Sequence, residues 1–211
     1  MKIIYLNSVG STQTYLKELL KKSSMELPCA ISANIQTSGI GSRDNLWIGC
    51  KGNLFLSFAI KLSEIPKDLK LESASIYYAY MLKEVLEKYG SKVWLKWPND
   101  FYINNSKIGG MITHVQNDVL ICGVGLNIVN SPNKFKKLDI KILKNDLIEK
   151  YFIYLEKKLL WKQVFSKYKL EFHLNKNFKT HTNKNKVLLK DASLNSDGSV
   201  MIDNERIYSL R

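Results

Sequence analysis

Several features are scarce or absent in this chain of 211 residues, and each absence excludes a class of protein. The longest apolar run, residues 119–126, is far shorter than the roughly 20 residues that a membrane-spanning helix needs. The N-terminus turns polar at Asn7, which is too early for a signal peptide. Three cysteines without C-x-x-C spacing and three histidines without metal-ligand spacing argue against a disulfide framework and a zinc site. We therefore expect a cytoplasmic protein that does not cross a membrane.

Arginine is rare as well, because all but three of the 32 basic residues are lysine, the exceptions being Arg43, Arg206 and Arg211. A formal net charge of +13 is compatible with a nucleic-acid partner. Surfaces that read a base sequence, however, usually use the planar guanidinium of arginine, so specific DNA binding is not expected. Residues 134–190 carry sixteen lysines against five acidic residues. We interpret that stretch as a solvated face, with partner binding as the alternative.

The composition that remains is that of a globular domain, with 45% hydrophobic and 24% charged residues. Period-two hydrophobicity predicts a half-buried strand over residues 54–60, and residues 73–89 give the clearest helical pattern. Four strands are predicted between residues 92 and 128, and their short turns require antiparallel neighbours. The sequence predicts an α+β fold: a mixed, mostly antiparallel sheet with helices over residues 1–173, and a small β module over residues 174–211.

The first segment that is suited to chemistry is the glycine-containing loop over residues 37–45. Gly39 and Gly41 allow backbone N–H groups to converge on an anion, and Ser42 and Arg43 add side-chain donors. This pattern is typical of a carboxylate or phosphate cradle. A flexible surface turn is the alternative.

Two further segments lie in the predicted strand region. Lys96 and Asp100 flank a proline-containing turn and could face one pocket, with an exposed ion pair as the alternative. Lys107 precedes Gly109 and Gly110 inside a predicted strand. Glycines in a strand indicate close approach of a ligand or another backbone, and the lysine could neutralise a phosphate. A β-bulge with a solvent-facing lysine is the alternative.

The order of these segments is more specific than any one of them. A Ser-Thr pair at a helix start, Gln…Gly-x-Gly-x-Arg…Trp, Lys-Trp-Pro-Asn-Asp, Lys-Ile-x-Gly and Gly-x-Gly-x-Asn together resemble the biotin–protein ligase family. The resemblance runs from about Tyr5 to Arg211, and its most distinctive motif is Lys-Trp-Pro-Asn-Asp at residues 96–100. It implies a class II synthetase-like sheet with an SH3-like C-terminal module. Because the match begins within the first dozen residues, we expect a short form without an N-terminal DNA-binding domain.

The resemblance implies an ATP-dependent ligase that activates biotin as biotinyl-5′-AMP. The biotin would then pass to a specific lysine of a biotin carboxyl carrier protein, as in acetyl-CoA carboxylase or a related carboxylase. Mg²⁺ would accompany ATP, and a homodimer is left open. A lipoate or octanoate ligase is an alternative, although its Arg-Arg and glycine-rich segment with a nearby histidine is absent here. A non-catalytic nucleic-acid-binding protein is a second alternative, but it would leave the glycine–lysine segments unexplained.

The resemblance also implies a role for individual residues. The biotin-binding residues would be Ser11, Thr12, Gln13, Gln36, Gly39, Gly41, Ser42, Lys107, Gly109 and Gly110. The nucleotide-binding residues would be Arg43, Trp47, Lys96, Asn99, Lys107 and Asn127, with Mg²⁺ near Asn127 rather than at a fixed protein site. The catalytic residues would be Lys107, Asp100, Lys96 and Arg43. Ile40 and Ser42 stand where the family often has arginine, so Arg43 is expected to take over the phosphate contact.

Overall fold

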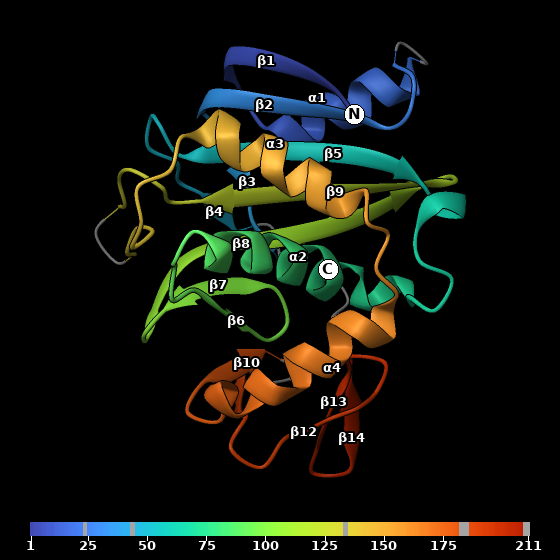
Figure 1. Cartoon of the computed structure of the whole chain (residues 1–211), viewed down its shortest axis with the longest axis vertical. Coiled ribbons are helices and arrows are strands. Elements are labelled where there is room, and N and C mark those ends of the chain that lie inside the picture. The colour runs from blue at the N-terminus through green and yellow to red at the C-terminus, as the bar shows by residue number, and fades with distance from the viewer. Residues whose placement is uncertain (23–24, 43–44, 133–134, 182–185, 209–211) are drawn as a thin grey trace.

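The computed structural model describes residues 1–22, 25–42, 45–132, 135–181 and 186–208, and its main element is a seven-stranded sheet (Figure 1). In spatial order the strands are β1 (Lys2–Val9), β2 (Cys29–Gln36), β5 (Leu54–Lys61), β9 (Val119–Leu126), β8 (Ser106–Gln116), β7 (Asp100–Ile103) and β6 (Trp94–Lys96). Strand β1 runs parallel to β2, and the other pairings in this sheet are antiparallel. The predicted mixed, mostly antiparallel sheet is confirmed.

Helices cover both faces of this sheet. They are α1 (Thr12–Lys21), α2 (Ala74–Lys88), α3 (Lys144–Leu155) and α4 (Trp161–Glu171), with short 3₁₀ turns at Leu62–Glu64, Leu71–Ser73 and Phe172–Asn175. Neighbouring side chains of β5 show the two faces: the Phe58 ring meets Tyr78 of α2 and Tyr151 of α3, whereas Ser57 meets Thr12 of α1. Helix α4 packs on α2. Among the described residues, no helix has both the length and the apolar character that a membrane span requires.

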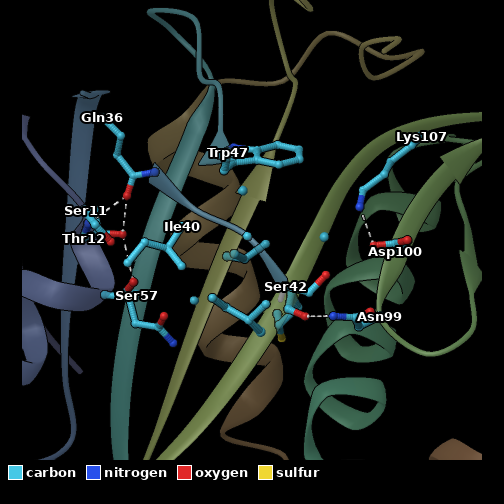
Figure 2. A pocket seen from close by; sticks show the side chains of 18 residues that line it. Ser11, Thr12, Gln36, Ile40, Ser42, Trp47, Ser57, Asn99, Asp100 and Lys107 are labelled. Atoms are coloured by element: carbon cyan, nitrogen blue, oxygen red, sulfur yellow. Dashed lines mark hydrogen bonds and ion pairs between the residues drawn. The ribbon is translucent and has the colours of Figure 1, made fainter. Parts of the chain in front are cut away.

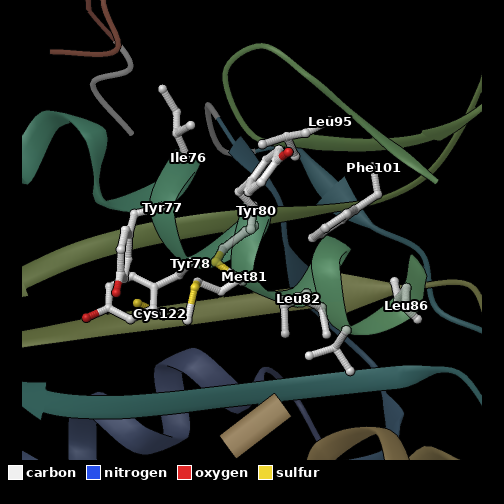
Figure 3. Packing of buried hydrophobic residues seen from close by; sticks show 14 of the residues in the cluster. Ile76, Tyr77, Tyr78, Tyr80, Met81, Leu82, Leu86, Leu95, Phe101 and Cys122 are labelled. Atoms are coloured by element: carbon white, nitrogen blue, oxygen red, sulfur yellow. The ribbon is translucent and has the colours of Figure 1, made fainter. Parts of the chain in front are cut away.

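Strand β5 is buried on both faces, so the prediction of a half-buried strand is wrong. All six residues from Leu54 to Ala59 are buried. The face that the sequence pattern left exposed is covered by α1, where Leu16 and Ala59 share a small apolar cluster. Helix α2 shows the same effect, because its residues are buried on every side from Ala74 to Leu86 (Figure 3). The helix lies between the sheet, α3 and α4, and a one-sided apolar stripe therefore understates its burial.

The C-terminal residues form two small sheets. Strands β10 (Lys179–His181) and β11 (Lys186–Leu188) pair with each other, and β12 (Ser193–Leu194), β13 (Val200–Ile202) and β14 (Glu205–Ile207) form a three-stranded sheet. Leu189 and Val200 are fully buried and belong to the same hydrophobic cluster as α2. The core therefore continues across residues 173 and 174, and the division into two domains there stays a prediction.

One contact between the C-terminal module and the rest of the chain is centred on Trp97. The backbone N–H of Trp97 donates to Asn175 Oδ1 at 2.7 Å, and its indole N–H donates to the Gly198 carbonyl at 2.8 Å. Beside it, the Ser73 hydroxyl donates to the Asp197 carbonyl. Gly198 has a φ of +82°, and a Cβ there would lie 2.6 Å from Ser73 Oγ, so this turn requires glycine. The turn that follows β6 is thus held by the module.

The carboxylate of Asp197 stabilises the module turn through charged hydrogen bonds. It accepts from the backbone and hydroxyl of Ser199 at 3.1 and 2.6 Å and from Arg206 Nη2 at 2.7 Å. Burial of the carboxylate acts to raise its pKa, but the hydrogen bonds from Ser199 and Arg206 outweigh burial and lower the pKa of Asp197 to about 2.

We predict that Asp197 contributes a pH-dependent part of the stability. Its folded-state pKa lies below the ordinary value of 3.8, so the contribution is present above about pH 4 and is lost as the pH falls towards 2. The shift corresponds to about 2 kcal/mol. The free energy of unfolding, measured with urea, should fall by this additional amount between pH 5 and 2 in the wild type and not in Asp197→Asn. Asp191→Asn, at an exposed position of the same module, should behave as the wild type; equal slopes for all three proteins would contradict the assignment.

Candidate functional site

A cavity of about 470 Å³, including the part open to solvent, lies on the α1 face of the sheet. It is roofed by the segment that carries β3 (Gly39–Ile40) and β4 (Leu46–Trp47). Figure 2 shows two groups of polar side chains on opposite sides of this cavity. The sequence-predicted residues that line it are Ser11, Thr12, Gln13, Gln36, Gly41, Ser42, Trp47, Asn99, Asp100, Lys107 and Gly110. The lining also includes residues to which no role in the site was assigned from the sequence: Ile40, Ser57, Met111, Ile112, Gly123, Val124 and Gly125, of which Ile40, Gly123 and Gly125 belong to the motifs quoted for the resemblance.

The first end of the cavity is an uncharged hydrogen-bonding network. Gln36 Oε1 accepts from the backbone N–H of Thr12 at 2.8 Å and from the Thr12 hydroxyl at 2.9 Å. Thr12 Oγ1 also lies 2.8 Å from Ser57 Oγ. Because the single hydroxyl proton of Thr12 goes to Gln36, Ser57 must be the donor in that second bond. Ser57 then keeps lone pairs, and Gln36 keeps its amide N–H groups, for a ligand.

Helix α1 begins at this end of the cavity. Ser11 is its N-cap, with the side-chain oxygen accepting from the backbone N–H of Thr14 at 3.3 Å. The cap agrees with the Ser-Thr pair that the sequence places at a helix start, and it leaves the Ser11 hydroxyl proton to donate into the cavity. A helix start also presents backbone N–H groups and the positive end of the helix dipole. The end formed by α1, β2 and β5 is therefore rich in neutral donors and acceptors.

The opposite end of the cavity is charged. Lys107 Nζ lies 2.6 Å from Asp100 Oδ1, and Lys96 Nζ lies 3.9 Å from Asp100 Oδ2. Lys96 is buried behind Asp100 and does not line the cavity. Two ammonium groups around one carboxylate leave a net charge of +1, which suits this end to an anion.

A register shift in the sheet brings Lys107 to the cavity. Side chains alternate along a strand, so Lys107 and Gly110 would ordinarily point to opposite faces. The pairing between β7 and β8 skips Ile108, whose side chain is fully buried in the core. The irregularity turns Lys107 to the face of Gly110, which pairs directly with Asp100. The sequence offered a β-bulge and a lysine that faces a ligand site as alternatives. The structure has both, because the bulge is what turns Lys107 towards the cavity.

Asn99 holds the turn that carries Asp100. Its side-chain amide donates to the carbonyl of Met111, and the backbone N–H of Met111 donates to the Asn99 carbonyl at 2.9 Å. The turn after β6 is therefore fastened to β8 on one side and, through Trp97, to the C-terminal module on the other. Asn99 Oδ1 is buried and has no partner among the described residues, so it is available to a ligand that donates a hydrogen bond.

Glycines form the floor of the cavity. Gly110 of β8 lies opposite Gly125 of β9. Gly123, two residues before Gly125 in the same strand, lies on the same face. A Cβ at Gly125 would lie 2.4 Å from Trp47 Nε1, so only glycine allows the indole to rest on the sheet. Trp47 Nε1 is buried without a partner among the described residues. Lys107 Nζ lies 6.0 Å from the Trp47 ring centroid, which places the indole at the boundary of the charged end.

Several predicted site residues do not line the cavity. A Cβ at Gly39 would lie 2.5 Å from the Trp47 carbonyl, and one at Gly109 would lie 2.5 Å from the Gly125 carbonyl. Close approach of a neighbouring backbone therefore explains both glycines without a ligand. Arg43, predicted to contact phosphate, lies outside the described residues.

Asn127 also lies outside the cavity lining. Its Oδ1 accepts from Asn53 at 3.0 Å, and its Nδ2 donates to the Lys136 carbonyl at 3.1 Å. Both ends of the amide are thus bound within the protein. The placement of Mg²⁺ near Asn127 stays a prediction; among the described residues, no group of three or more His, Cys, Asp and Glu could hold a metal ion.

Comparisons with known proteins give a consistent result. The model of the biotin/lipoate A/B protein ligase family matches residues 5–127. The biotin acetyl coenzyme A carboxylase synthetase from Helicobacter pylori, solved with bound biotinylated ATP, is 40% identical with a TM-score of 0.94, and the match covers 98% of this chain and 99% of that one.

Two other matches are more distant. A biotin protein ligase from Aquifex aeolicus, solved with biotin and ATP, shares the fold with a TM-score of 0.78 at 21% identity, over 100% of this chain and 96% of that one. The bifunctional ligase/repressor BirA of Bacillus subtilis is 28% identical over 138 residues, which is 63% of this chain and 42% of that protein. The chain spans less than half the length of the curated relatives it matches.

Proposed function

The chain belongs to the biotin/lipoate A/B protein ligase family, and from that premise we propose that it is an ATP-dependent biotin–protein ligase. The observation that carries the proposal is the division of one cavity into an uncharged hydrogen-bonding end and a cationic end. The ureido ring of biotin is neutral and polar, whereas its carboxylate and the phosphates of ATP are anions. Each end of the cavity therefore has a matching part of the substrates.

The uncharged end selects for a ureido group over an alkyl or dithiolane group. A ureido carbonyl needs donors, which Ser11 and Gln36 supply, and its N–H groups need an acceptor, which Ser57 supplies. A lipoyl or octanoyl chain would leave these buried polar groups unpaired. Buried groups of this kind discriminate strongly against analogues that cannot hydrogen-bond with them. This favours biotin over lipoate or octanoate.

The charged end suits the first step of the reaction. A carboxylate oxygen of biotin attacks the α-phosphorus of ATP, and the bond from this phosphorus to the oxygen that bridges the α- and β-phosphates breaks. Pyrophosphate leaves, and biotinyl-5′-AMP remains in the site. The protein has to align two anions and offset their repulsion, and Lys107 is placed for this task. Mg²⁺ would be held by the phosphates of ATP and would offset part of their charge. Lys107 is paired with Asp100, so an arriving anion competes with that carboxylate.

Asp100 suits the second step. The amine of an acceptor lysine attacks the carbonyl carbon of the mixed anhydride, a C–N bond forms, and AMP leaves. The acceptor lysine attacks as a neutral amine, so its ammonium group must first lose a proton. A carboxylate at this position can orient the lysine and accept that proton. Asp100 lies at the cavity edge between two lysines, and Asn99 Oδ1 beside it offers a further acceptor for an ammonium group.

The acceptor is proposed to be the biotin carboxyl carrier domain of acetyl-CoA carboxylase or a related carboxylase. Its lysine has to enter on the α1 face, where the cavity opens. Helix α3 covers the other face of the sheet, through Tyr151 and Phe58, and α4 packs on α2 there (Figure 1). We therefore assign the lysines of these two helices to a solvated surface and not to acceptor docking.

A cytoplasmic location is proposed from the cysteines. Cys29 and Cys122 are buried and unpaired. Burial raises the pKa of the Cys29 thiol to about 11, which keeps it in the unreactive protonated form. All three cysteines lie among the described residues and none forms a disulfide, so the cysteines do not require an oxidising compartment.

The proposed function predicts ATP–pyrophosphate exchange that depends on biotin. The purified protein should be assayed with biotin, lipoate, octanoate or no acid, each with Mg²⁺ and ATP. Of the three acids, only biotin is expected to support exchange, because the uncharged end of the cavity discriminates against lipoate and octanoate. Exchange with lipoate or octanoate instead would assign the chain to the other branch of its family, and no exchange with any acid by folded protein would refute the ligase.

Lys107→Ala should lower the rate of biotin-dependent exchange by about two to three orders of magnitude, the scale seen when one preorganised electrostatic contact is lost. The measurement is the exchange rate at saturating biotin and ATP. Lys150→Ala, at an exposed position of α3 behind the sheet, is the matched control and should be unchanged. A Lys107 variant within a few-fold of the wild type would remove this residue from the site.

Asp100→Ala should slow biotin transfer at least as much as activation, by about two orders of magnitude if the carboxylate accepts the proton. Transfer is measured in single turnover, from preformed biotinyl-5′-AMP to a carrier domain, and activation by exchange. Asp118→Ala, in the exposed turn between β8 and β9, should alter neither rate. A defect confined to activation would contradict the role given to Asp100.

A further inference from the structure

Asn53 lies just before β5, is fully buried, and does not line the cavity. Its Oδ1 accepts from three successive backbone N–H groups: Ile128 and Val129 at 3.1 Å, and Asn130 at 3.2 Å. Its Nδ2 donates to Asn127 Oδ1 at 3.0 Å and to the Asn130 carbonyl at 2.8 Å. One side chain therefore fixes the conformation of residues 127–130.

An amide side chain is matched to this position by its chemistry. The three N–H groups require an acceptor, and the two oxygens on the other side require a donor. A carboxylate would supply the acceptor, but its second oxygen would lie against Asn127 Oδ1 and the Asn130 carbonyl, which need a donor. An apolar residue would leave the buried N–H groups unpaired. Among the uncharged side chains, only Asn and Gln combine a strong acceptor oxygen with a two-proton donor, and Asn has the shorter reach.

The residues held by Asn53 lead to the charged end of the cavity. Asn127 binds the following part of the chain twice, because its Nδ2 donates to the Lys136 carbonyl at 3.1 Å and its carbonyl accepts from Leu138 at 2.8 Å. The backbone N–H of Lys136 in turn donates to the carbonyl of Lys107 at 3.1 Å. The neighbouring Phe135 packs against Trp47, with ring centroids 6.0 Å apart.

We propose that Asn53 is a positioning residue for the nucleotide-binding end of the site. It fixes the backbone of residues 127–130 and, through Asn127, sets residues 135–138 against Lys107 and Trp47. The uncharged end, built from α1, β2 and β5, has no bond to these residues among the contacts described above. Asn53 thus acts on ATP binding and not on recognition of the ureido ring. This inference rests on the proposed function.

The test compares Asn53→Ala and Asn53→Asp with the wild type. Asn53→Ala removes every contact, whereas Asn53→Asp keeps the acceptor for the three N–H groups and loses the donor. Tyr151→Phe is the control: it removes a buried hydrogen bond, from Tyr151 to the Tyr78 carbonyl, on the opposite face of the sheet. The measurements are the KM for ATP in exchange, the Kd for biotin without ATP, and hydrogen exchange of the amides of residues 128–130.

Asn53→Ala should raise the KM for ATP by about tenfold or more, because small displacements of positioning groups are costly, while the Kd for biotin stays within about threefold. The amides of residues 128–130 should lose protection in Asn53→Ala and retain most of it in Asn53→Asp. If Asn53→Ala does not fold, Asn53→Asp carries the test, and its KM for ATP should rise because the bonds to Asn127 and Asn130 are lost. Tyr151→Phe should lower stability without changing either constant.

Three results would overturn this inference without touching the proposed function. The first two are unchanged protection of residues 128–130 in Asn53→Ala, and lost protection with an unchanged KM for ATP. An equal rise in the KM for ATP and the Kd for biotin would also overturn it, because that pattern indicates general loosening. A wild-type protein without biotin-dependent exchange would refute the proposed function, and the two failures are therefore distinguishable.

Discussion

The ion pair between Lys107 and Asp100 is the interaction on which the rest of the site depends. It exists because the strand pairing skips Ile108, which turns Lys107 to the cavity face, the same face as Asp100. Both partners are fixed from outside the cavity. The turn that carries Asp100 is fastened to the C-terminal module through the two N–H groups of Trp97, and the Lys107 carbonyl accepts from Lys136. The residues that do the chemistry are few, but their support spans most of the chain.

The cavity separates two kinds of recognition that would interfere if they were mixed. A neutral network of hydroxyl and amide groups can be specific only if its donors and acceptors have fixed directions, and the bonds from Ser57 to Thr12 and from Thr12 to Gln36 fix them. A cationic group placed among them would attract any anion. Trp47, lying on Gly125 between the two ends, keeps them apart and covers the floor of the cavity. The remaining glycines of the floor, Gly110 and Gly123, allow a ligand to lie directly on the sheet.

The sheet and most of the cavity residues could be predicted from the sequence, because strand periodicity, turn residues and the order of short motifs are local features. Burial of β5 on both faces was not predicted, because it results from α1 packing on the second face, which carries Phe55 and Ala59 as well as the polar Ser57. Ser57 and Asn53 were missed for a related reason: their partners lie 45 and 74 residues away along the chain. The one available signal was a polar residue within or beside an apolar strand. The skip at Ile108 is a property of strand pairing: Gly109 and Gly110 indicated a possible β-bulge, but the sequence did not show that the bulge would turn Lys107 to the cavity.

A catalyst that holds an activated acyl group runs the risk of labelling itself, and this chain is rich in the very amines that such a group acylates. The geometry limits that risk in two ways. The lysines of α3 and α4 are separated from the cavity by the thickness of the sheet. Lys107, which lies inside the cavity, is paired with Asp100 until an anion of the substrates replaces that carboxylate, and an ammonium nitrogen paired with either anion has no lone pair with which to attack. On the proposed chemistry, the anions that Lys107 binds also keep the nearest amine from becoming an unintended acceptor.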